Sequence, residues 1–234
     1  MTYDYVGTEL DFFARATNWK QYLSRTVSPF LRGDVLEVGA GIGTTTRAFI
    51  DGRASTWLCL EPDEALATRM RASFEADPVS PTPAIRSALL NDLESDRTFD
   101  CIIYVDVLEH IEDDQAELAA AQGHLRSGGH LVVIGPAHQW LFSEFDTAIG
   151  HFRRYSRRSL QAVVPTDMER VMLRYMDALG VALSAANRLL LRSSAPTPTQ
   201  IRTWDGVVVP ISRLIDPLLF WSVGKSVTGV WRQP

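Results

Sequence analysis

Three glycines at alternating positions, Gly39, Gly41 and Gly43, directly follow an apolar run that begins at Asp34. Glycine suits a turn in which the backbone must adopt a positive φ or approach a ligand closely. The segment from Thr44 has the composition of a helix, and the N-terminus of a helix favours a negatively charged group. This pattern predicts a turn that holds a nucleotide cofactor at the end of a buried strand.

The spacing of this turn separates two classes of cofactor. A dinucleotide site uses G-x-G-x-x-G, but here the third glycine comes one position too early and Thr44 takes the place of the last glycine. The run is instead E-x-G-x-G-x-G, starting at Glu37. A second acid, Glu61, follows the next apolar run, and its carboxylate can accept hydrogen bonds from both ribose hydroxyls of an adenosine. The simpler interpretation of Glu61 is an acid that favours the start of a helix.

The order of the predicted elements indicates an α/β fold. Apolar runs alternate with amphipathic stretches, and a near-continuous apolar run such as DCIIYV at 100–105 is typical of a strand covered on both faces. Strands and helices in alternation predict a parallel sheet with helices on both sides. The predicted strands are 34–38, 56–60, 84–88, 100–105, 130–134, 169–176 and 226–231, and the predicted helices include 8–31, 44–50, 62–75 and 113–125.

Length and composition fit one domain of 234 residues with 46% apolar residues, enough for a sizeable core. We divide it into an N-terminal helical cap (1–33), a cofactor-binding core (34–135), a substrate-binding and helical insertion region (136–222) and a last strand (223–234). The net charge of −5 argues against a protein that grips nucleic acid over a broad face. Cys59 and Cys101 lie in apolar runs and predict buried core residues, and no zinc or disulfide spacing is present.

The chain shows no signal-peptide pattern at its start and no apolar run near the ~18 residues of a membrane span. We therefore expect a cytoplasmic protein with no transmembrane segment. We expect no metal site.

Four motifs, in order, resemble those of class I S-adenosylmethionine-dependent methyltransferases. They are VLEVGAGIGTTT at 35–46, LEPD at 60–63, FDCIIYVDVLEHIEDD at 99–114 and LRSGGHLVVIGP at 125–136. The chain also resembles small bacterial methyltransferases of types 11 and 12, which often carry GHFRRY after the fifth strand, as at 150–155 here. The resemblance covers about residues 10–175 and implies a Rossmann-like fold with a seven-stranded, mostly parallel sheet. It also implies S-adenosylmethionine as the methyl donor.

The resemblance implies roles for the cofactor site. Glu37 and the backbone of Gly39–Gly43 would hold the methionine moiety, Glu61 the ribose, and Asp106 would lie near the amino group of the cofactor. Aromatic residues of the first helix would either cover the cofactor or pack on the edge of the sheet. The predicted cofactor-binding residues are Trp19, Tyr22, Glu37, Gly39, Ala40, Gly41, Gly43, Thr44, Glu61, Pro62, Leu89, Leu90, Asp106 and Val107.

The adenine contacts depart from the commonest pattern. Leu89 stands where many members of the superfamily place an aspartate for the adenine amino group. Asp92 or a backbone carbonyl is expected to take that role.

Methyl transfer from a sulfonium is an in-line displacement, so the enzyme must align donor and acceptor and exclude water. A general base is needed only where the acceptor carries a proton that must leave. The candidate bases are His110, His138 and His151, since imidazole titrates near neutrality; His110 could instead cap or pack its loop. The candidate substrate-binding residues are Trp140, Phe145, Asp146, Arg153, Arg154 and Tyr155.

Three features of the substrate region have more than one interpretation. The arginines at 153–158 could grip a carboxylate or phosphate of the substrate, or could simply be solvated around a helix that Ser156 caps. The aromatic residues could line a pocket or pack in the core. The apolar stretches 179–192 and 207–221 could form a lid, a homodimer face, a membrane-surface contact or ordinary helical core.

The acidic balance favours a small-molecule acceptor such as a secondary metabolite, a sugar or a lipid-linked intermediate. Two alternatives to this function remain. One is a non-catalytic regulatory protein that binds an adenosine cofactor. The other is a nicotinamide-dependent oxidoreductase, which the glycine spacing disfavours.

Overall fold

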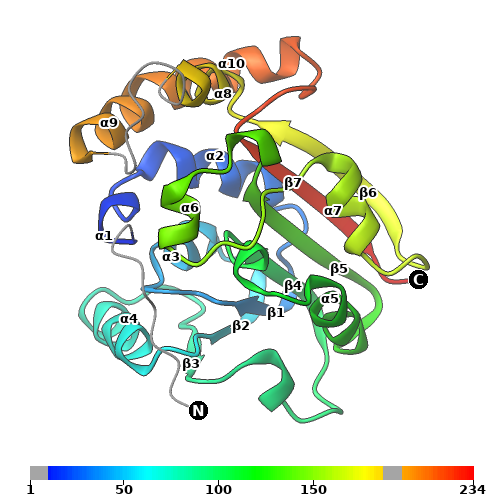
Figure 1. The fold of residues 1–234 in the computed structure, drawn as a ribbon. Coiled ribbons are helices and arrows are strands. Elements are labelled where there is room, and N and C mark those ends of the chain that lie inside the picture. The colour runs from blue at the N-terminus through cyan, green and yellow to red at the C-terminus, as the bar shows by residue number, and fades with distance from the viewer. Residues whose placement is uncertain (1–9, 187–196) are drawn as a thin grey trace.

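A seven-stranded sheet forms the centre of the molecule in the computed structural model, which describes residues 10–186 and 197–234 (Figure 1). The strands are β1 (Gly33–Val38), β2 (Ala54–Leu60), β3 (Ala84–Arg86), β4 (Phe99–Val105), β5 (Leu125–Pro136), β6 (Glu169–Met176) and β7 (Ser226–Arg232). Their order is β3-β2-β1-β4-β5-β7-β6, and only β7 runs antiparallel to its neighbours. The predicted α/β fold with a mostly parallel sheet is confirmed.

Helices cover both faces of this sheet (Figure 1). They are α1 (Leu10–Phe13), α2 (Thr17–Val27), α3 (Thr44–Phe49), α4 (Glu64–Ala76), α5 (Asp114–Gly123), α6 (Glu144–Ala148), α7 (Arg157–Val163), α8 (Ala178–Ala186), α9 (Pro198–Thr203) and α10 (Val209–Leu218). A π-helical turn at Trp204–Val208 joins α9 to α10. Ser156 caps α7 by accepting a hydrogen bond from the backbone N–H of Ser159, as predicted.

The prediction of one helix over 8–31 is wrong within the described residues, because α1 and α2 are separate. Asp205, distant in the chain, stabilises the start of α2: its carboxylate accepts hydrogen bonds from the backbone N–H groups of Asn18 and Trp19, at 3.2 and 2.8 Å. These N–H groups lie in the first turn of α2, which has no partner for them of its own. The first two residues of the predicted helix lie outside the described residues.

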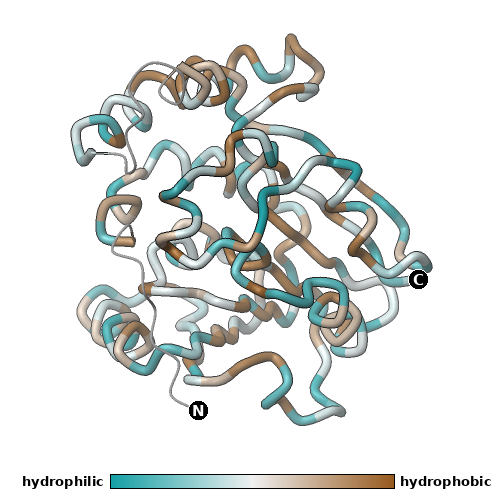
Figure 2. Tube along the Cα trace, in the orientation of Figure 1, coloured by the Kyte–Doolittle hydropathy of each residue, from teal (hydrophilic) through white to brown (hydrophobic). Residues whose placement is uncertain are grey.

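Alternation along the strands divides the apolar residues into two cores, and hydrophobic residues mark the central strands in Figure 2. On β4, Cys101 and Ile103 face the core under α2, α3 and α4, whereas Ile102 and Tyr104 face α5 and α7. Cys59 joins the first core, and both cysteines are buried and free. The interpretation of the cysteines as small core residues is therefore confirmed.

The helical insertion between β6 and β7 is anchored to the N-terminal helices by buried aspartates. Asp216 of α10 is fully buried and accepts hydrogen bonds from the hydroxyl of Tyr22 (2.8 Å) and from the backbone N–H groups of Asp177 (2.7 Å) and Ala178 (2.9 Å). Asp177 in turn accepts from the indole of Trp204 at 2.7 Å. The inner side of the insertion is thus helical core.

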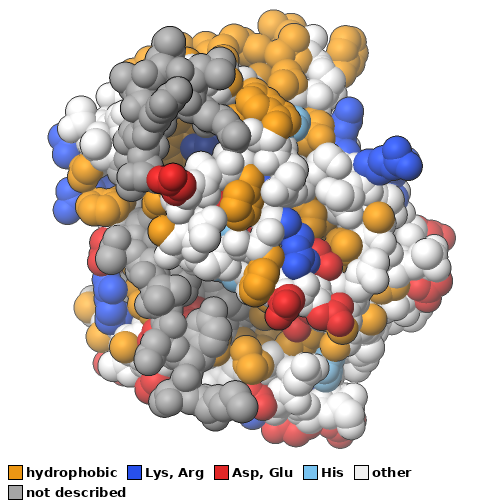
Figure 3. Space-filling model, in the orientation of Figure 1, with side chains coloured by type: hydrophobic (Ala, Val, Ile, Leu, Met, Phe, Trp, Pro, Cys, Tyr) orange, Lys and Arg blue, Asp and Glu red, His pale blue; other side chains and the backbone are white. Residues whose placement is uncertain are grey.

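The outer side of α10 stays apolar and exposed. Leu214, Leu218 and Phe220 are 69%, 77% and 85% exposed. Figure 3 shows hydrophobic side chains gathered over α8 and α10 at the top of the molecule. None of the helices in the described ranges has the length and hydropathy that crossing a membrane requires.

Candidate active site

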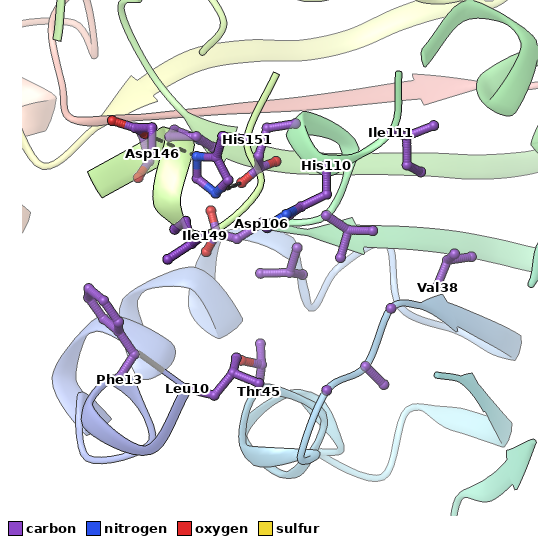
Figure 4. A pocket seen from close by; sticks show the side chains of 18 of the residues that line it. Leu10, Phe13, Val38, Thr45, Asp106, His110, Ile111, Asp146, Ile149 and His151 are labelled. Atoms are coloured by element: carbon purple, nitrogen blue, oxygen red, sulfur yellow. Dashed lines mark hydrogen bonds and ion pairs between the residues drawn. The ribbon is translucent and has the colours of Figure 1, made fainter. Parts of the chain in front are cut away.

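A cavity of about 1020 Å³ lies at the carboxyl ends of β1, β2, β4 and β5, where ligands of open parallel sheets bind. The glycine turn after β1 forms part of its wall, and the segments after β4 and β5 form another part. Figure 4 shows the polar side chains Asp106, His110, Asp146 and His151 on one side of it. Leu10 lies on the opposite side with Phe13 and Thr45.

The glycine turn requires glycine for two physical reasons. Gly39 and Gly43 both have left-handed backbones, with φ of +69° and +77°. A Cβ on Gly39 would approach the side chain of Val107 to 2.6 Å, and a Cβ on Gly43 would approach Met70 to 2.8 Å. Gly43 is also the N-cap of α3, so the N-terminus of that helix adjoins the turn. Gly43 itself contacts the core below the turn and does not line the cavity.

Glu61 lies at the end of β2 and supports the turn. Its two carboxylate oxygens accept hydrogen bonds from the backbone N–H of Gly41 at 2.7 Å and of Asp63 at 3.0 Å. A carboxylate has about four acceptor positions, so each oxygen can still accept from a ligand hydroxyl. The N-cap of α4 is Asp63, and Glu61 lies two residues before it. Burial raises the pKa of Glu61.

Two further acids reach the cavity from the ends of β1 and β4. Glu37 is 2% exposed and accepts a hydrogen bond from the indole of Trp57 at 3.0 Å. Burial raises the pKa of Glu37 to about 7, although the hydrogen bond from Trp57 acts to lower it. Asp106 is accessible from the cavity although protein encloses it, and this burial raises its pKa to about 6. Its left-handed backbone (φ +53°) is uncommon for a residue other than glycine and is typical of functional sites.

The opposite end of the cavity carries a hydrogen-bonded pair, His151 and Asp146. His151 Nδ1 lies 3.0 Å from Asp146 Oδ1, and Arg154 donates to both oxygens of that carboxylate at 2.8 and 2.9 Å. Asp146 is fully buried. Burial opposes its ionisation, but the hydrogen bonds from His151 and Arg154 hold the pKa of Asp146 well below its usual range.

His110 and Glu109 complete this polar wall. The imidazole rings of His110 and His151 meet edge to face with centroids 4.5 Å apart, and burial lowers the pKa of His110 to about 4. Glu109 is completely buried, and neither of its carboxylate oxygens has a hydrogen-bond partner among the described residues. Burial, together with the nearby charge of Asp106, raises the pKa of Glu109 strongly.

Most of the residues predicted for the site meet at this cavity. The predicted residues that line it are Trp19, Glu37, Gly39, Ala40, Gly41, Thr44, Glu61, Pro62, Leu89, Leu90, Asp106, Val107, His110, Phe145, Asp146, His151 and Arg154. Asp92, considered for the adenine, accepts from the backbone N–H of Leu89 at 2.8 Å and is not among the residues that line the cavity.

Several predicted residues lie away from the cavity, each for a local reason. Tyr22 points to the helical insertion, where it donates to Asp216. His138 stacks on Tyr175 with ring centroids 4.7 Å apart, and Trp140 is 53% exposed at the surface. Neither of these two therefore lines the predicted site.

Arg153 and Tyr155 are structural in the same sense. Arg153 forms an ion pair of 2.6 Å with Asp114, and the hydroxyl of Tyr155 donates to the same carboxylate at 2.7 Å. Both side chains are directed to Asp114, and neither lines the cavity that His151 and Arg154 line. The guanidinium of Arg153 is thus paired with Asp114, and that of Arg154 with Asp146.

The sequence reasoning missed several cavity residues. Glu109 was detectable, because it directly precedes His110 at the end of β4. Lys20 was also detectable, since it lies beside Trp19 on α2; its Nζ donates to the carbonyl of Phe13 at 2.6 Å, and burial lowers its pKa to about 8. Lys225 had no local signal, because it enters the cavity from the loop before β7.

One family model matches part of the chain. Residues 36–131 match the profile of the family described as methyltransferase domain. No curated protein sequence matches the chain.

Many solved structures share the fold. The N-methyltransferase NodS from Bradyrhizobium japonicum, solved with S-adenosyl-L-homocysteine, is 14% identical with a TM-score of 0.60, over 98% of this chain and 92% of NodS. An S-adenosylmethionine-dependent methyltransferase from Clostridium acetobutylicum is 10% identical with a TM-score of 0.60, over 96% of this chain and 95% of the other. A chain of the Haloferax volcanii complex between the Trm112 methyltransferase activator and a methyltransferase is 15% identical with a TM-score of 0.63, over 98% and 97% of the two chains.

Proposed function

We propose that this chain, which carries a class I S-adenosylmethionine-dependent methyltransferase domain, transfers the methyl group of its cofactor to a small molecule held in the same cavity. The observation that carries this proposal is the continuous cavity of about 1020 Å³, which joins the glycine turn to the wall of His110, Asp146 and His151. Pockets for a single ligand commonly measure about 300–1,000 Å³. This cavity is at the upper end of that range, which leaves room for a cofactor and a small acceptor together.

The end of the cavity at β1 and β2 suits the cofactor. Glu37 and the turn at Gly39–Gly41 would hold the methionine moiety, and the carboxylate of Glu61 would accept hydrogen bonds from the ribose hydroxyls. Leu89 and Leu90 would contact the adenine. The cofactor supplies an activated methyl group, and the protein supplies its orientation and an enclosure from water.

The other end suits the acceptor. Phe145, Asp146 and His151 line it, and His110 adds a neutral imidazole at pH 7 because of its low pKa. Of the three candidate bases, only His110 and His151 lie on the cavity wall. The guanidinium of Arg154 already donates hydrogen bonds to both carboxylate oxygens of Asp146. This pairing argues against a role for Arg154 in binding an acidic acceptor. An acceptor with hydroxyl or amine groups fits this wall better.

Nucleic acid is a poor candidate for the acceptor. The net charge of −5 gives no electrostatic attraction for phosphates. The exposed apolar face of α10 offers a surface for a homodimer or a lipid-linked acceptor, but the cavity itself does not depend on either.

Two measurements test the proposed function. Calorimetric titration with S-adenosylhomocysteine should show one binding site, and labelled S-adenosylmethionine should pass its methyl group to a member of a panel of small hydroxyl and amine compounds. Absence of binding at millimolar ligand would refute the proposal. Tight binding without turnover on any acceptor would instead favour a regulatory protein that senses the cofactor.

A further inference from the structure

Glu109 is a buried carboxyl group that makes no hydrogen bond within the part of the chain that the structure describes. It is 0% exposed, and both of its Oε atoms lack a hydrogen bond among the described residues. Burying a polar group in this way costs free energy, so buried carboxylates in proteins are normally paired or bound to a metal. Glu109 therefore indicates that something binds next to it.

Two imidazoles lie beside this carboxylate. His151 Nε2 is 3.8 Å from Glu109 Oε1, too far for a hydrogen bond. One ligand atom each from Glu109, His110 and His151 lies within 4.8 Å of the others. Atoms bound to one metal at about 2.0–2.2 Å are about 3–3.5 Å from one another, so the most distant of these atoms need to approach by about 1.5 Å.

The hydrogen bonds behind His151 fix its orientation. Asp146, held ionised by Arg154, is an acceptor for His151 Nδ1 at 3.0 Å. The proton of the neutral ring then lies on Nδ1, and the lone pair lies on Nε2, on the side of Glu109. A carboxylate behind a histidine is the usual second layer around a metal-binding imidazole.

We infer that Glu109, His110 and His151 bind one divalent transition-metal cation, with an open coordination position towards the cavity. Two imidazoles and one carboxylate favour Zn²⁺, Fe²⁺, Co²⁺ or Ni²⁺ over Mg²⁺ and Ca²⁺, which prefer oxygen ligands. Three protein ligands with an open position are typical of catalytic rather than structural metal sites. The expectation of no metal site was based on the absence of a metal-binding motif among neighbouring residues. Such a motif cannot show that Glu109 and His110 lie close to His151 in the fold.

The site gives the two histidines a role other than that of a general base. A cation there would bind an oxygen or nitrogen atom of the acceptor and hold it at the acceptor end of the cavity. This use rests on the proposed function, whereas the binding of the cation does not.

The test uses the full chain, freed of metal with a chelator and titrated with CoCl₂ by calorimetry and visible absorption. We expect one equivalent to bind, with absorption bands that report nitrogen ligands. Glu109→Gln, which keeps the shape of the side chain, should weaken Co²⁺ binding at least tenfold. His138→Gln, a change at a histidine outside the cavity, should leave it unchanged. No binding at millimolar Co²⁺, or equal binding by Glu109→Gln, would overturn the inference.

Two controls separate this inference from its alternatives. Circular dichroism and thermal unfolding of Glu109→Gln should match those of the parent chain, which shows that the variant is folded. If the parent chain binds Co²⁺ through Glu109 but not S-adenosylhomocysteine, the metal site stands and the proposed function fails. If the parent chain binds S-adenosylhomocysteine but not Co²⁺, the metal site is refuted and the proposed function stands.

Discussion

Tyr155 donates its hydroxyl to Asp114 over 2.7 Å and so fastens the segment after β5 to the start of α5. The backbone N–H of Phe152 adds a hydrogen bond of 2.8 Å to the carbonyl of Glu109. His151 lies on the segment after β5, and His110 lies in the short turn that precedes α5. The polar wall of the cavity therefore depends on contacts that lie outside the cavity.

Tyr155→Phe is expected to destabilise the protein by about 2 kcal/mol, because it removes a buried hydrogen bond to a charged acceptor. Urea unfolding measures this loss. Phe152→Leu, three residues earlier at a side chain that is 51% exposed, is the matched control and should change the free energy of unfolding by less than about 0.5 kcal/mol. A Tyr155→Phe protein as stable as the parent would show that the hydrogen bond to Asp114 contributes nothing net.

Asp216→Ala is expected to be more damaging, with a loss of at least about 3 kcal/mol, because it leaves the hydroxyl of Tyr22 and two backbone N–H groups without an acceptor. Asp216→Asn keeps one acceptor oxygen and should lose less. Thermal unfolding compares them, with Leu218→Ala, at a 77% exposed position of the same helix, as the control. Equal stability of the Ala variant and the control would mean that the insertion is not anchored through Asp216.

The central strands could be predicted from the sequence because they are buried on both faces, and the edge strand β6 was predicted as well, although its first residues are exposed. β6 has the predicted bounds, Glu169–Met176, and the strands β1, β2, β4 and β7 differ from prediction by at most two residues at each end. The break between α1 and α2 was not readable, since Asp205, which stabilises it, is more than 180 residues away in the chain. Local patterns report what neighbouring residues prefer, and not which distant side chain satisfies a helix end.

The same distinction applies to the cavity. The glycine turn and Glu61 come from consecutive strands whose ends meet at one edge of the sheet, so their proximity follows from topology. The polar wall needs a contact between two loops, and the sequence does not show which side of a loop faces inwards. His151 and Arg154 line the cavity, as the sequence predicted. Arg153 and Tyr155, which were predicted for the same site from the same segment, do not line it.

Glu61→Ala is expected to weaken the affinity for S-adenosylhomocysteine at least tenfold, about 1.4 kcal/mol, through loss of the acceptor for the ribose hydroxyls. Part of the effect would come from the N–H of Gly41, which also loses its acceptor. Calorimetry measures the dissociation constant. Glu64→Ala, at an exposed acid in the first turn of α4, is the matched control and should bind as the parent does. Unchanged affinity in Glu61→Ala would refute the ribose role.

Glu37 is expected to make stability depend on pH near neutrality. Its pKa is about 7 in the folded protein, where burial favours the protonated form, against 4.5 in the unfolded chain. The stabilisation from the retained proton is complete below the unfolded value and is lost as pH rises through the folded value, since ionisation then favours unfolding. The difference between the two pKa values corresponds to about 3 kcal/mol.

The measurement is urea unfolding of the parent and of Glu37→Gln at pH 5, 6, 7 and 8, which lie around the two pKa values. Gln has the same shape and does not titrate, so subtracting its curve removes the contribution of every other group. The free energy of unfolding of the parent, relative to the variant, should fall steadily from pH 5 to pH 7 and level off by pH 8. Parallel curves would mean that Glu37 is already ionised in the folded protein, with the indole of Trp57 compensating for its burial.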